Sequence, residues 1–417
     1  MMPEPDINRA WARIEALAAM TRPDMPWTRR AFSPLFDQSR SWLRAEFEKA
    51  GLETHVDAAG NLIGTRPGKV AGARPLITGS HCDTVVGGGR FDGILGVLAG
   101  IEVAATLHDH GVELDHPFQV IDFLSEEPSD YGISCVGSRG FAGTLTAPML
   151  ASTNEEGETL AQAMRRIGAD PDALAVPLNG PGSVAAFVEL HIEQGPVLEN
   201  TGIPIGIVTG IVGIRRQRIV VNGQADHAGT TPMDIRHDAL AGAARIVTAV
   251  NELASRMSGA PHYVVATIGR ILMTPNVPNA VPAQVEMVLE MRSDAEEVLA
   301  GFSDLALGSV GEALADLRVS VEVSELSRSQ PVACTPAIAD VIEAAAGKLG
   351  YPTMRLPSGA GHDAAYVAAS GLMGMLFVPC LGGRSHCPEE WIEPQQMLDG
   401  IRVLQQTLLM LDDTLEV

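Results

Sequence analysis

The sequence predicts an α/β protein in which a mixed sheet flanked by helices is interrupted by a smaller inserted domain. Short apolar runs of strand length alternate with stretches whose apolar residues recur at helical spacing, as in layered α/β folds. Between residues 213 and 327 the order changes to strand, helix, two strands, helix and strand, which is typical of a ferredoxin-like α+β module. We therefore expect a main domain over residues 1–212 and 328–417 and an inserted domain over residues 213–327.

The composition fits a two-domain protein of a reducing compartment. The chain of 417 residues is longer than one hydrophobic core usually supports, and 46% of its residues are hydrophobic. A formal net charge of −22 argues against nucleic acid or an anionic membrane as a partner. The N-terminus has no signal-peptide pattern, and no apolar stretch approaches the ~18 residues of a membrane span. Five scattered cysteines without a C-x-x-C pair favour reduced thiols, so we expect a cytoplasmic protein.

The first elements of the main domain are predicted from helical periodicity, turn residues and apolar runs. Residues 8–20 and 33–51 carry apolar residues at helical spacing, and the second of these helices closes on a glycine. Residues 54–65 are expected to form a hairpin because their centre holds Asp, Gly and Asn. A short apolar strand over residues 74–78 then leads through a glycine-rich turn to a helix over residues 94–110.

Four apolar strands of the main domain are each followed by side chains that could bind a metal. The strands over residues 74–78, 118–124, 184–190 and 374–379 lead to His81, to Glu126 and Glu127, to His191 and to His386. Ligands of open α/β sheets bind beyond the carboxyl ends of the strands, so we expect these side chains at one edge. Asp92 opens the helix after the glycine-rich turn, where its carboxylate could bridge two cations. Each group alone is better explained by a polar loop, but together they predict a metal centre.

The residue pair His81 and Asp83 gives a further indication of metal binding. Residues two apart in a strand face the same side, so Asp83 is expected to accept a hydrogen bond from the His81 ring. Such a bond would fix the tautomer of the ring and direct its other nitrogen at a metal.

The inserted domain is predicted from four strands and two helices. The strands are expected over residues 215–222, 263–272, 281–291 and 319–326, and the helices over residues 235–257 and 295–317. His227 lies in a turn of small residues after the first strand, whereas His237 is expected on the following helix in a structural role. After the insert, the pattern of the main domain resumes with a helix over residues 336–349.

These motifs resemble those of the M20 metallopeptidase-like amidohydrolases. The resemblance is greatest to the branch that holds N-carbamoyl-L-amino acid hydrolases, allantoate amidohydrolases and β-ureidopropionase, and it runs nearly end to end. It rests on six blocks in the family's order, at residues 79–84, 89–93, 126–127, 189–195, 226–233 and 385–386. It implies a di-zinc aminopeptidase-like fold for the main domain, and a dimerisation and lid function for the inserted domain.

The resemblance also implies the metal ligands and the catalytic groups. His81, Asp92 and His191 would hold one divalent ion, and Asp92, Glu127 and His386 would hold the other. Glu126 would be the general base that moves a proton from the attacking water to the leaving nitrogen. Asp83 would orient His81. The family's metal is expected to be Zn²⁺, with Mn²⁺, Co²⁺ and Ni²⁺ as alternatives.

Further residues are implied to bind a small carboxylate substrate. His227 would stabilise the oxyanion, reaching the site of the neighbouring subunit in a homodimer formed through the inserted domain. Asn279 and Arg292 match the positions that bind the substrate carboxylate, and Arg216 is a further candidate; the planar fork of arginine suits that task. Gln194 and His362 match positions that contact a ureido group.

One segment departs from the family pattern, which commonly continues its Glu-Glu pair with Gly-Ser-Arg-Phe. This chain has Pro128-Ser129-Asp130-Tyr131, so an anion replaces a cation close to a metal ligand. The departure leaves the metal centre in place but bears on the substrate. We expect a metal-dependent hydrolase of linear amide or ureido C–N bonds, with an N-carbamoyl-L-amino acid or related ureido acid preferred. The alternatives are an aminoacylase or dipeptidase of the same family, and a metal-binding protein without catalysis.

Overall fold

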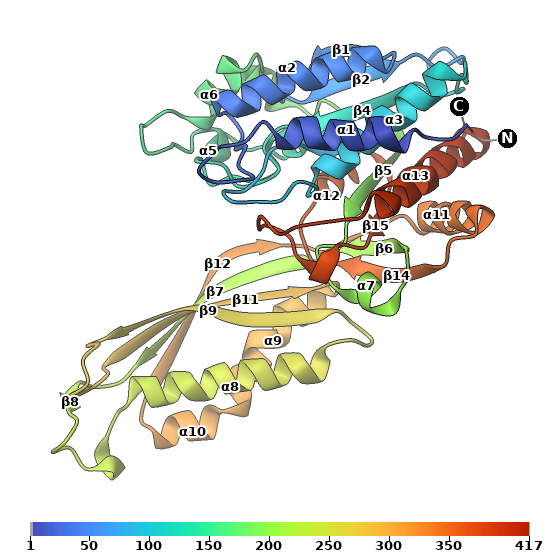
Figure 1. The fold of residues 1–417 in the computed structure, drawn as a ribbon. Coiled ribbons are helices and arrows are strands. Elements are labelled where there is room, and N and C mark those ends of the chain that lie inside the picture. The colour runs from blue at the N-terminus through green and yellow to red at the C-terminus, as the bar shows by residue number, and fades with distance from the viewer. Residues whose placement is uncertain (1–2, 417) are drawn as a thin grey trace. The chain divides into compact units, whose positions relative to one another are not determined.

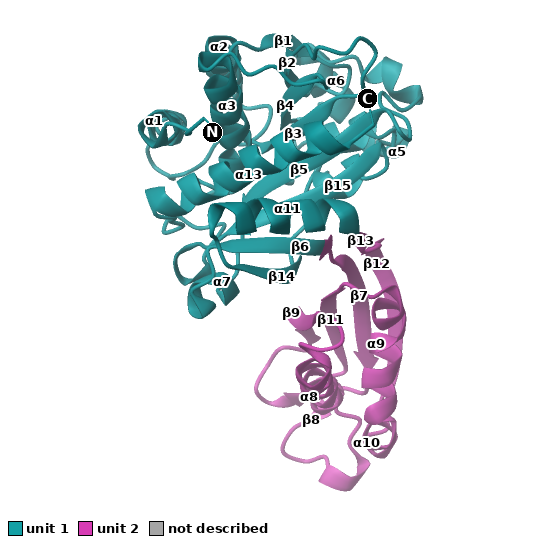
Figure 2. Cartoon of the chain, turned by 90° about the vertical axis from the view of Figure 1, so that its right-hand side faces the viewer, with its two compact units in different colours: residues 1–209, 334–417 teal, residues 210–333 magenta. Residues whose placement is uncertain are grey.

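The computed structural model describes residues 3–416, which fall into two compact units. Unit 1 comprises residues 1–209 and 334–417, and unit 2 comprises residues 210–333 (Figure 2). The insert expected at residues 213–327 lies within unit 2. None of the helices in residues 3–416 is both long and apolar enough to cross a membrane.

Unit 1 contains a mixed sheet of nine strands, of which only residues 210–211 and 332–333 fall within the range of unit 2 (Figure 1). Its order is β1 (Glu53–Val56), β2 (Leu62–Arg66), β4 (Phe118–Phe123), β3 (Leu76–His81), β5 (Val184–Ile192), β15 (Gly371–Val378) and β6 (Ile205–Ile211), with β13 (Val332–Ala333) and β14 (Thr353–Ser358) both pairing with β6. The four central strands β4, β3, β5 and β15 run parallel to one another. The strands that flank these four, β2 and β6, are antiparallel to β4 and β15, respectively. The predicted mixed sheet is therefore confirmed.

Helices cover both faces of this sheet, which explains why its central strands are mostly apolar, with buried exceptions such as Asp122 on β4 and Glu189 on β5. The even-numbered residues of β5, such as Val188 and Leu190, belong to one core with α1 (Ile7–Ala18), α3 (Ile94–Asp109), α11 (Pro336–Leu349) and α13 (Pro394–Thr414). Its odd-numbered residues face α12 (Ala364–Val367), because Glu189 accepts the Ala364 N–H at 3.2 Å. α4 (Val136–Phe141) lies next to α12, and α2 (Pro34–Lys49) packs on β1 and β2.

The helix α3 fixes the position of the glycine-rich turn in front of it. Its residues from Ile94 to Leu107 are all buried, as expected for an apolar helix inside a domain. The helix begins after Gly93, which has a φ of 69° and where an added Cβ would overlap the His81 ring. Only glycine fits here without strain, and this close approach sets Asp92 beside His81.

Three features of the elements differ from the sequence prediction. The helix α8 (Ala239–Met257) starts after Asp238, whose carboxylate caps two backbone N–H groups, so His237 precedes the helix. The helix expected over 295–317 is divided at Val310 into α9 (Glu296–Ser309) and α10 (Gly311–Asp316). The apolar pattern also did not indicate α13, although its capping box at Glu393 and the following proline are helix-start signals.

Unit 2 has the ferredoxin-like arrangement that its element order predicts. Its sheet has the order β12 (Ser320–Ser329), β7 (Gly213–Asn222), β11 (Gln284–Ser293) and β9 (Val264–Thr274), and all neighbours are antiparallel. The helices α8 and α9 pack on one face, where the odd-numbered residues of β11 are buried (Figure 1). A separate pair of short strands, β8 (Asp226–His227) and β10 (Ala280–Val281), lies beyond the Asn222 end of β7.

Candidate metal centre

The candidate ligands lie where the parallel strands of unit 1 end. His81 is the last residue of β3, and His191 is the last but one of β5. The Glu126–Glu127 pair follows β4, and His386 lies in the segment after β15. Because these four strands are parallel neighbours, their carboxyl ends meet at one edge of the sheet, as expected for a ligand site in this type of fold.

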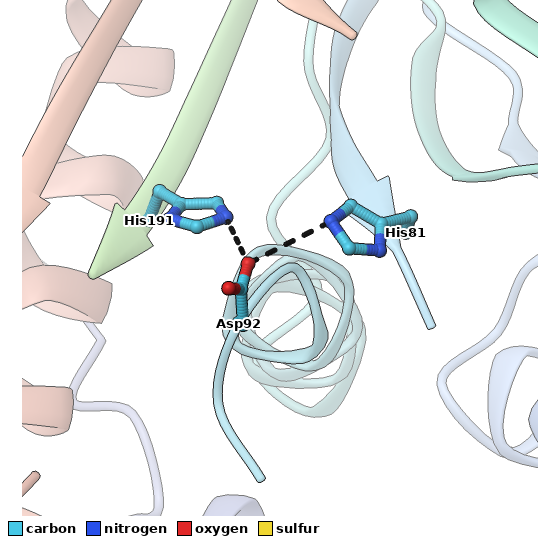
Figure 3. Close-up of side chains that lie close together, drawn as sticks. All are labelled: His81, Asp92 and His191. Atoms are coloured by element: carbon cyan, nitrogen blue, oxygen red, sulfur yellow. Dashed lines mark ion pairs between the residues drawn. The ribbon is translucent and has the colours of Figure 1, made fainter. Parts of the chain in front are cut away.

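The first group of ligands consists of His81, Asp92 and His191 (Figure 3). Asp92 Oδ1 is 3.2 Å from His191 Nε2 and 3.8 Å from His81 Nε2, so the carboxylate lies between the two rings. One donor atom from each side chain lies within 4.8 Å of the others. All three side chains are buried.

Backbone carbonyls fix the orientation of both histidine rings. His191 Nδ1 donates to the Ile192 carbonyl at 2.8 Å, and His81 Nδ1 is 3.1 Å from the Asp83 carbonyl. A ring that donates through Nδ1 presents Nε2 as a lone-pair ligand, so both Nε2 atoms are directed at the Asp92 side.

The second group consists of Asp92, Glu127 and His386. His386 Nε2 is 3.1 Å from Asp92 Oδ2 and 3.0 Å from Glu127 Oε1. The two groups share Asp92, which faces one group with Oδ1 and the other with Oδ2. The His386 side chain is 49% exposed, whereas the Asp92 and Glu127 side chains are each 8% exposed, so His386 lies on the open side of the centre.

The electrostatics of the two groups favour bound positive charge. Hydrogen bonds to Asp92 and Glu127 raise the pKa of His386 to about 11. Burial by itself would raise the pKa of Asp92, but hydrogen bonds from His191 and His386 hold it well below its usual range. Burial likewise lowers the pKa of His81, yet the surrounding carboxylates raise it well above its usual value. Asp92 therefore stays ionised although it is buried, and an ionised carboxylate beside several imidazoles is a donor set that suits divalent cations.

Glu126 belongs to neither group but lies beside the first. Its Oε2 is 3.6 Å from His81 Nε2, and the Cys135 thiol donates to its Oε1 at 3.2 Å. Burial raises the pKa of Glu126 well above its usual value, which brings the carboxyl group closer to the range useful for proton transfer. The arrangement can therefore place two cation sites next to the carboxylate of Glu126, which belongs to neither site.

Asp83 supports the centre in a different way from the one expected. The His81 ring is nearer to the Asp83 carbonyl, at 3.1 Å, than to its carboxylate, at 3.5 Å. The carboxylate instead accepts the backbone N–H groups of Glu126 and Glu127, both at 3.2 Å. The reason is that β3 ends at His81, so strand alternation does not extend to Asp83. Asp83 thus joins the end of β3 to the end of β4.

The two residues expected to contact a ureido group lie against the centre. Gln194 Nε2 donates to Asp92 Oδ2 at 2.7 Å, while the buried Gln194 Oε1 has no hydrogen-bond partner among residues 3–416. His362 packs its ring against His191, with 4.6 Å between centroids, and its Nε2 is 2.7 Å from Ser358 Oγ. Burial and the nearby His191 lower the pKa of His362 well below its usual value, so this ring is neutral.

In unit 2, Arg216 and Arg292 are brought together by one carboxylate. Glu290 Oε2 accepts from Arg216 Nε at 2.5 Å, and Glu290 Oε1 accepts from Arg292 Nε at 3.0 Å and from its terminal nitrogen at 2.7 Å. All three side chains lie on the face of the sheet opposite α8 and α9. The structure therefore pairs both arginines with Glu290.

His227 and Asn279 are also neighbours in unit 2. They lie on the paired strands β8 and β10, where His227 is opposite Ala280 and the Asn279 carbonyl accepts the Ala228 N–H at 3.0 Å. The exposed His227 accepts the N–H groups of Gly229 and Thr230 through Nδ1. Its proton is therefore on Nε2, which leaves that nitrogen as a donor.

The divergent segment 128–131 contacts residues that precede the first motif, which begins at residue 79. Asp130 forms an ion pair with Arg30 at 2.9 Å, and Arg30 also donates to the Pro128 carbonyl at 3.3 Å. Tyr131 packs edge-on against Phe32, with 5.4 Å between the ring centroids. The anion at position 130 therefore has its own cationic partner.

Sequence reasoning assigned no function to three buried residues around the centre. Cys135 contacts Glu126, as described above, and the Glu189 carboxylate accepts from Ser80 at 2.7 Å. The third is Glu390, which accepts the backbone N–H of Asp92. Burial and the nearby Asp92 carboxylate raise the pKa of Glu390 to about 7. For Glu189 and Glu390 the only available signal was an acidic residue inside or near a recognised motif, which does not distinguish a structural contact from an exposed carboxylate. Cys135 lies outside all six motifs.

Comparisons with known proteins agree with this geometry. Residues 77–410 match the model of peptidase family M20/M25/M40. The chain is 40% identical to the N-carbamoyl-L-amino acid amidohydrolase of Geobacillus stearothermophilus, over 97% of this chain and 98% of that protein. It is 31% identical to the allantoate amidohydrolase of Bacillus subtilis over 92% of each chain.

Solved structures give the same result. An amidase of the hydantoinase/carbamoylase family from Burkholderia multivorans superposes with a TM-score of 0.91 at 37% identity, covering 98% of both chains. The aminopeptidase PepT of Bacillus cereus, at 17% identity and a TM-score of 0.63, shares the fold alone. The family and branch recognised from the six sequence blocks are thus confirmed, and the chain belongs to peptidase family M20/M25/M40.

Proposed function

We propose that the protein is a metal-dependent amidohydrolase that cleaves the C–N bond of an N-carbamoyl-L-amino acid, releasing the amino acid, ammonia and carbon dioxide. The observation that carries this proposal is the pair of ligand groups that share Asp92, with the additional carboxylate of Glu126 beside them. The similarity to N-carbamoyl-L-amino acid amidohydrolases over nearly the whole chain favours ureido substrates over the acyl and peptide alternatives.

The donor set supports two divalent ions, with Zn²⁺ preferred. His81, Asp92 and His191 would hold one, and Asp92, Glu127 and His386 the other. Imidazole with carboxylate is a usual ligand set for Zn²⁺, and Mn²⁺, Co²⁺ and Ni²⁺ are the alternatives. Bound ions of this kind polarise the scissile carbonyl and lower the pKa of water.

Glu126 is the residue that moves the proton. Its carboxylate takes a proton from the attacking water and passes it to the leaving nitrogen. The Asp83 carboxylate holds its backbone at 3.2 Å and the Cys135 thiol holds Oε1, so the group is fixed at the edge of the metal centre. Its raised pKa makes the carboxylate a stronger base than an exposed glutamate.

Gln194 is placed to recognise the carbamoyl group. Its Nε2 donates a hydrogen bond to Asp92, which fixes the side chain. The Oε1 atom then faces away from that bond and has no hydrogen-bond partner among the described residues. A buried acceptor without a partner favours a ligand that donates, and the NH₂ of a carbamoyl group is such a donor. His362, held neutral against His191, is the second proposed contact.

Arg292 is proposed to bind the substrate carboxylate, together with Asn279 and with Arg216 as a further candidate. The guanidinium groups of Arg216 and Arg292 both pair with the carboxylate of Glu290, so these three side chains together carry a net positive charge. That excess charge supports binding of an anion, and the planar fork of arginine matches a carboxylate.

Replacing Arg292→Lys is expected to raise KM for an N-carbamoyl-L-amino acid by ~10–100-fold, because one charge-assisted fork is reduced to a point charge. The effect on kcat is expected to be smaller, and steady-state kinetics would separate the two. Arg218→Lys is the matched control. Arg218 lies on β7 and also pairs with a glutamate, Glu286, at 2.6 Å. Equal KM values for the two variants would exclude Arg292 as the carboxylate contact.

A homodimer is supported by the spacing of these groups within unit 2. Arg216 lies on β7 between Gly213 and Asn222, whereas His227 and Asn279 lie beyond the Asn222 end. Positions 216 and 222 are separated by roughly 20 Å of extended strand, which a small ureido acid does not span. We propose that His227 and Asn279 serve the site of a second copy, where His227 Nε2–H stabilises the oxyanion.

The test of the reaction is a substrate panel with metal-reconstituted protein. We expect ammonia release from N-carbamoyl-L-amino acids, in preference to N-carbamoyl-β-alanine, allantoate, N-acetyl-amino acids and dipeptides, and loss of the activity on metal removal. Cleavage confined to acyl or peptide substrates would move the protein to the aminoacylase or dipeptidase alternative. Bound metal without turnover on any member would favour the non-catalytic one. The free cysteines, four of them buried, support a cytoplasmic location, which stays a prediction.

A further inference from the structure

Glu390 is a fully buried carboxylate that uses both of its oxygens within the centre. Its Oε1 accepts the backbone N–H of Phe91 at 2.7 Å and that of Asp92 at 3.1 Å. Its Oε2 lies 2.8 Å from Ser385 Oγ. The side chain has no exposed surface, so these bonds are not weakened by competition with water.

Ser385 extends this contact to the side chain of Asp92. Its hydroxyl is 2.5 Å from Asp92 Oδ2, the oxygen that faces the second ligand group, and it immediately precedes His386. Glu390 therefore holds Asp92 through the backbone on one side and through Ser385 on the other. These contacts link two segments that lie almost 300 positions apart in the chain.

The glycine-rich turn is shaped to receive this carboxylate. A Cβ at Gly89 would overlap the carboxyl group of Glu390, so the backbone of the turn wraps directly around it. The preceding residue, Glu389, has none of these contacts: its side chain is 60% exposed and pairs with Arg384 at 3.0 Å on the surface. Two adjacent glutamates thus differ entirely in environment.

We propose that Glu390 is a positioning residue that holds Asp92 and His386 in the positions that they need to bind the two ions. It reaches neither the substrate nor the ions and acts through the ligands that it and Ser385 contact. The inference rests on the proposed metal centre. Outer hydrogen-bond partners of metal ligands typically account for ~10–100-fold in metal affinity or activity.

The test compares Glu390→Gln with Glu389→Gln in the full-length protein. Glutamine keeps one carbonyl oxygen for the Phe91 and Asp92 N–H groups but places an amide NH₂ in the position of the carboxylate oxygen that contacts Ser385. We expect Glu390→Gln to lower the affinity for Zn²⁺ at one or both sites by ~10–100-fold, measured by competition with a chromophoric chelator. The Co²⁺-loaded variant is expected to show an altered visible absorption spectrum, and kcat to fall more than KM changes. Glu389→Gln is expected to match the wild type in all three readouts.

A second variant keeps the test decisive if Glu390→Gln does not fold. Ser385→Ala removes only the hydroxyl that joins Glu390 to Asp92 and is expected to lower Zn²⁺ affinity in the same direction. The positioning role alone would be overturned if Glu390→Gln showed wild-type Zn²⁺ affinity and an unchanged Co²⁺ spectrum. If Glu390→Gln is insoluble, the same result in Ser385→Ala would overturn it. Failure of the wild-type protein itself to bind Zn²⁺ would overturn the metal centre and this inference together.

Discussion

Glu126→Gln is expected to lower kcat for an N-carbamoyl-L-amino acid by ~10²–10⁴-fold, the usual contribution of a general base. Bound metal is expected to stay at the wild-type level, because Glu126 belongs to neither ligand group. Glutamine has nearly the same shape, and its backbone N–H still donates to Asp83. The loss would therefore report the missing base and not a collapse of the site. Metal analysis of the purified protein and steady-state kinetics measure the two quantities separately.

The neighbouring residue supplies the matched control. Glu127→Gln replaces a carboxylate that lies 3.0 Å from His386 Nε2 in the second group, so it is expected to lose both metal and activity. The two substitutions are chemically identical and adjacent in the chain, but only one removes a proposed ligand. Retention of activity within about tenfold in Glu126→Gln would assign the base elsewhere. Loss of metal from Glu126→Gln would instead make Glu126 a ligand.

Hybrid dimers of Glu126→Gln and His227→Ala chains are expected to recover about half of the wild-type activity per dimer, although each variant alone is inactive. If His227 serves the site of its partner, the hybrid contains one site with an intact Glu126 and an intact His227. The other site lacks both. Co-expression with two different affinity tags, purification through both and an ammonia-release assay would measure the recovery.

The control hybrid combines Glu126→Gln with Asp92→Asn, both of which alter unit 1. Every site in this dimer lacks one residue of the metal centre, so no recovery is expected. An inactive first hybrid would show that His227 acts within its own chain, and full activity of His227→Ala alone would show that His227 has no catalytic role. A monomeric protein in sedimentation equilibrium would contradict the proposed homodimer directly.

The fold was predictable from local patterns because its central features are local. The four strands that lead to His81, Glu126, His191 and His386 are mainly apolar, as expected for strands that are buried on both faces. The ferredoxin-like order of unit 2 follows from its element sequence. The two ligand groups that share Asp92 coincide with the sets implied by the family resemblance, although their roles await the experiments above.

Only the tertiary structure decided the contacts that support these residues. The Asp83 carboxylate binds the Glu126 and Glu127 amides because the chain leaves the strand after His81. Glu390 reaches the turn at Asp92 from the far end of the chain, and nothing in its local sequence separates it from the exposed Glu389. Periodicity and motifs reflect only the contacts that a segment makes with residues close to it in the sequence. Partners that the sheet brings together across almost 300 positions leave no pattern in either segment. The sequence by itself therefore determined the candidate ligands, and the fold determined which residues hold them in place.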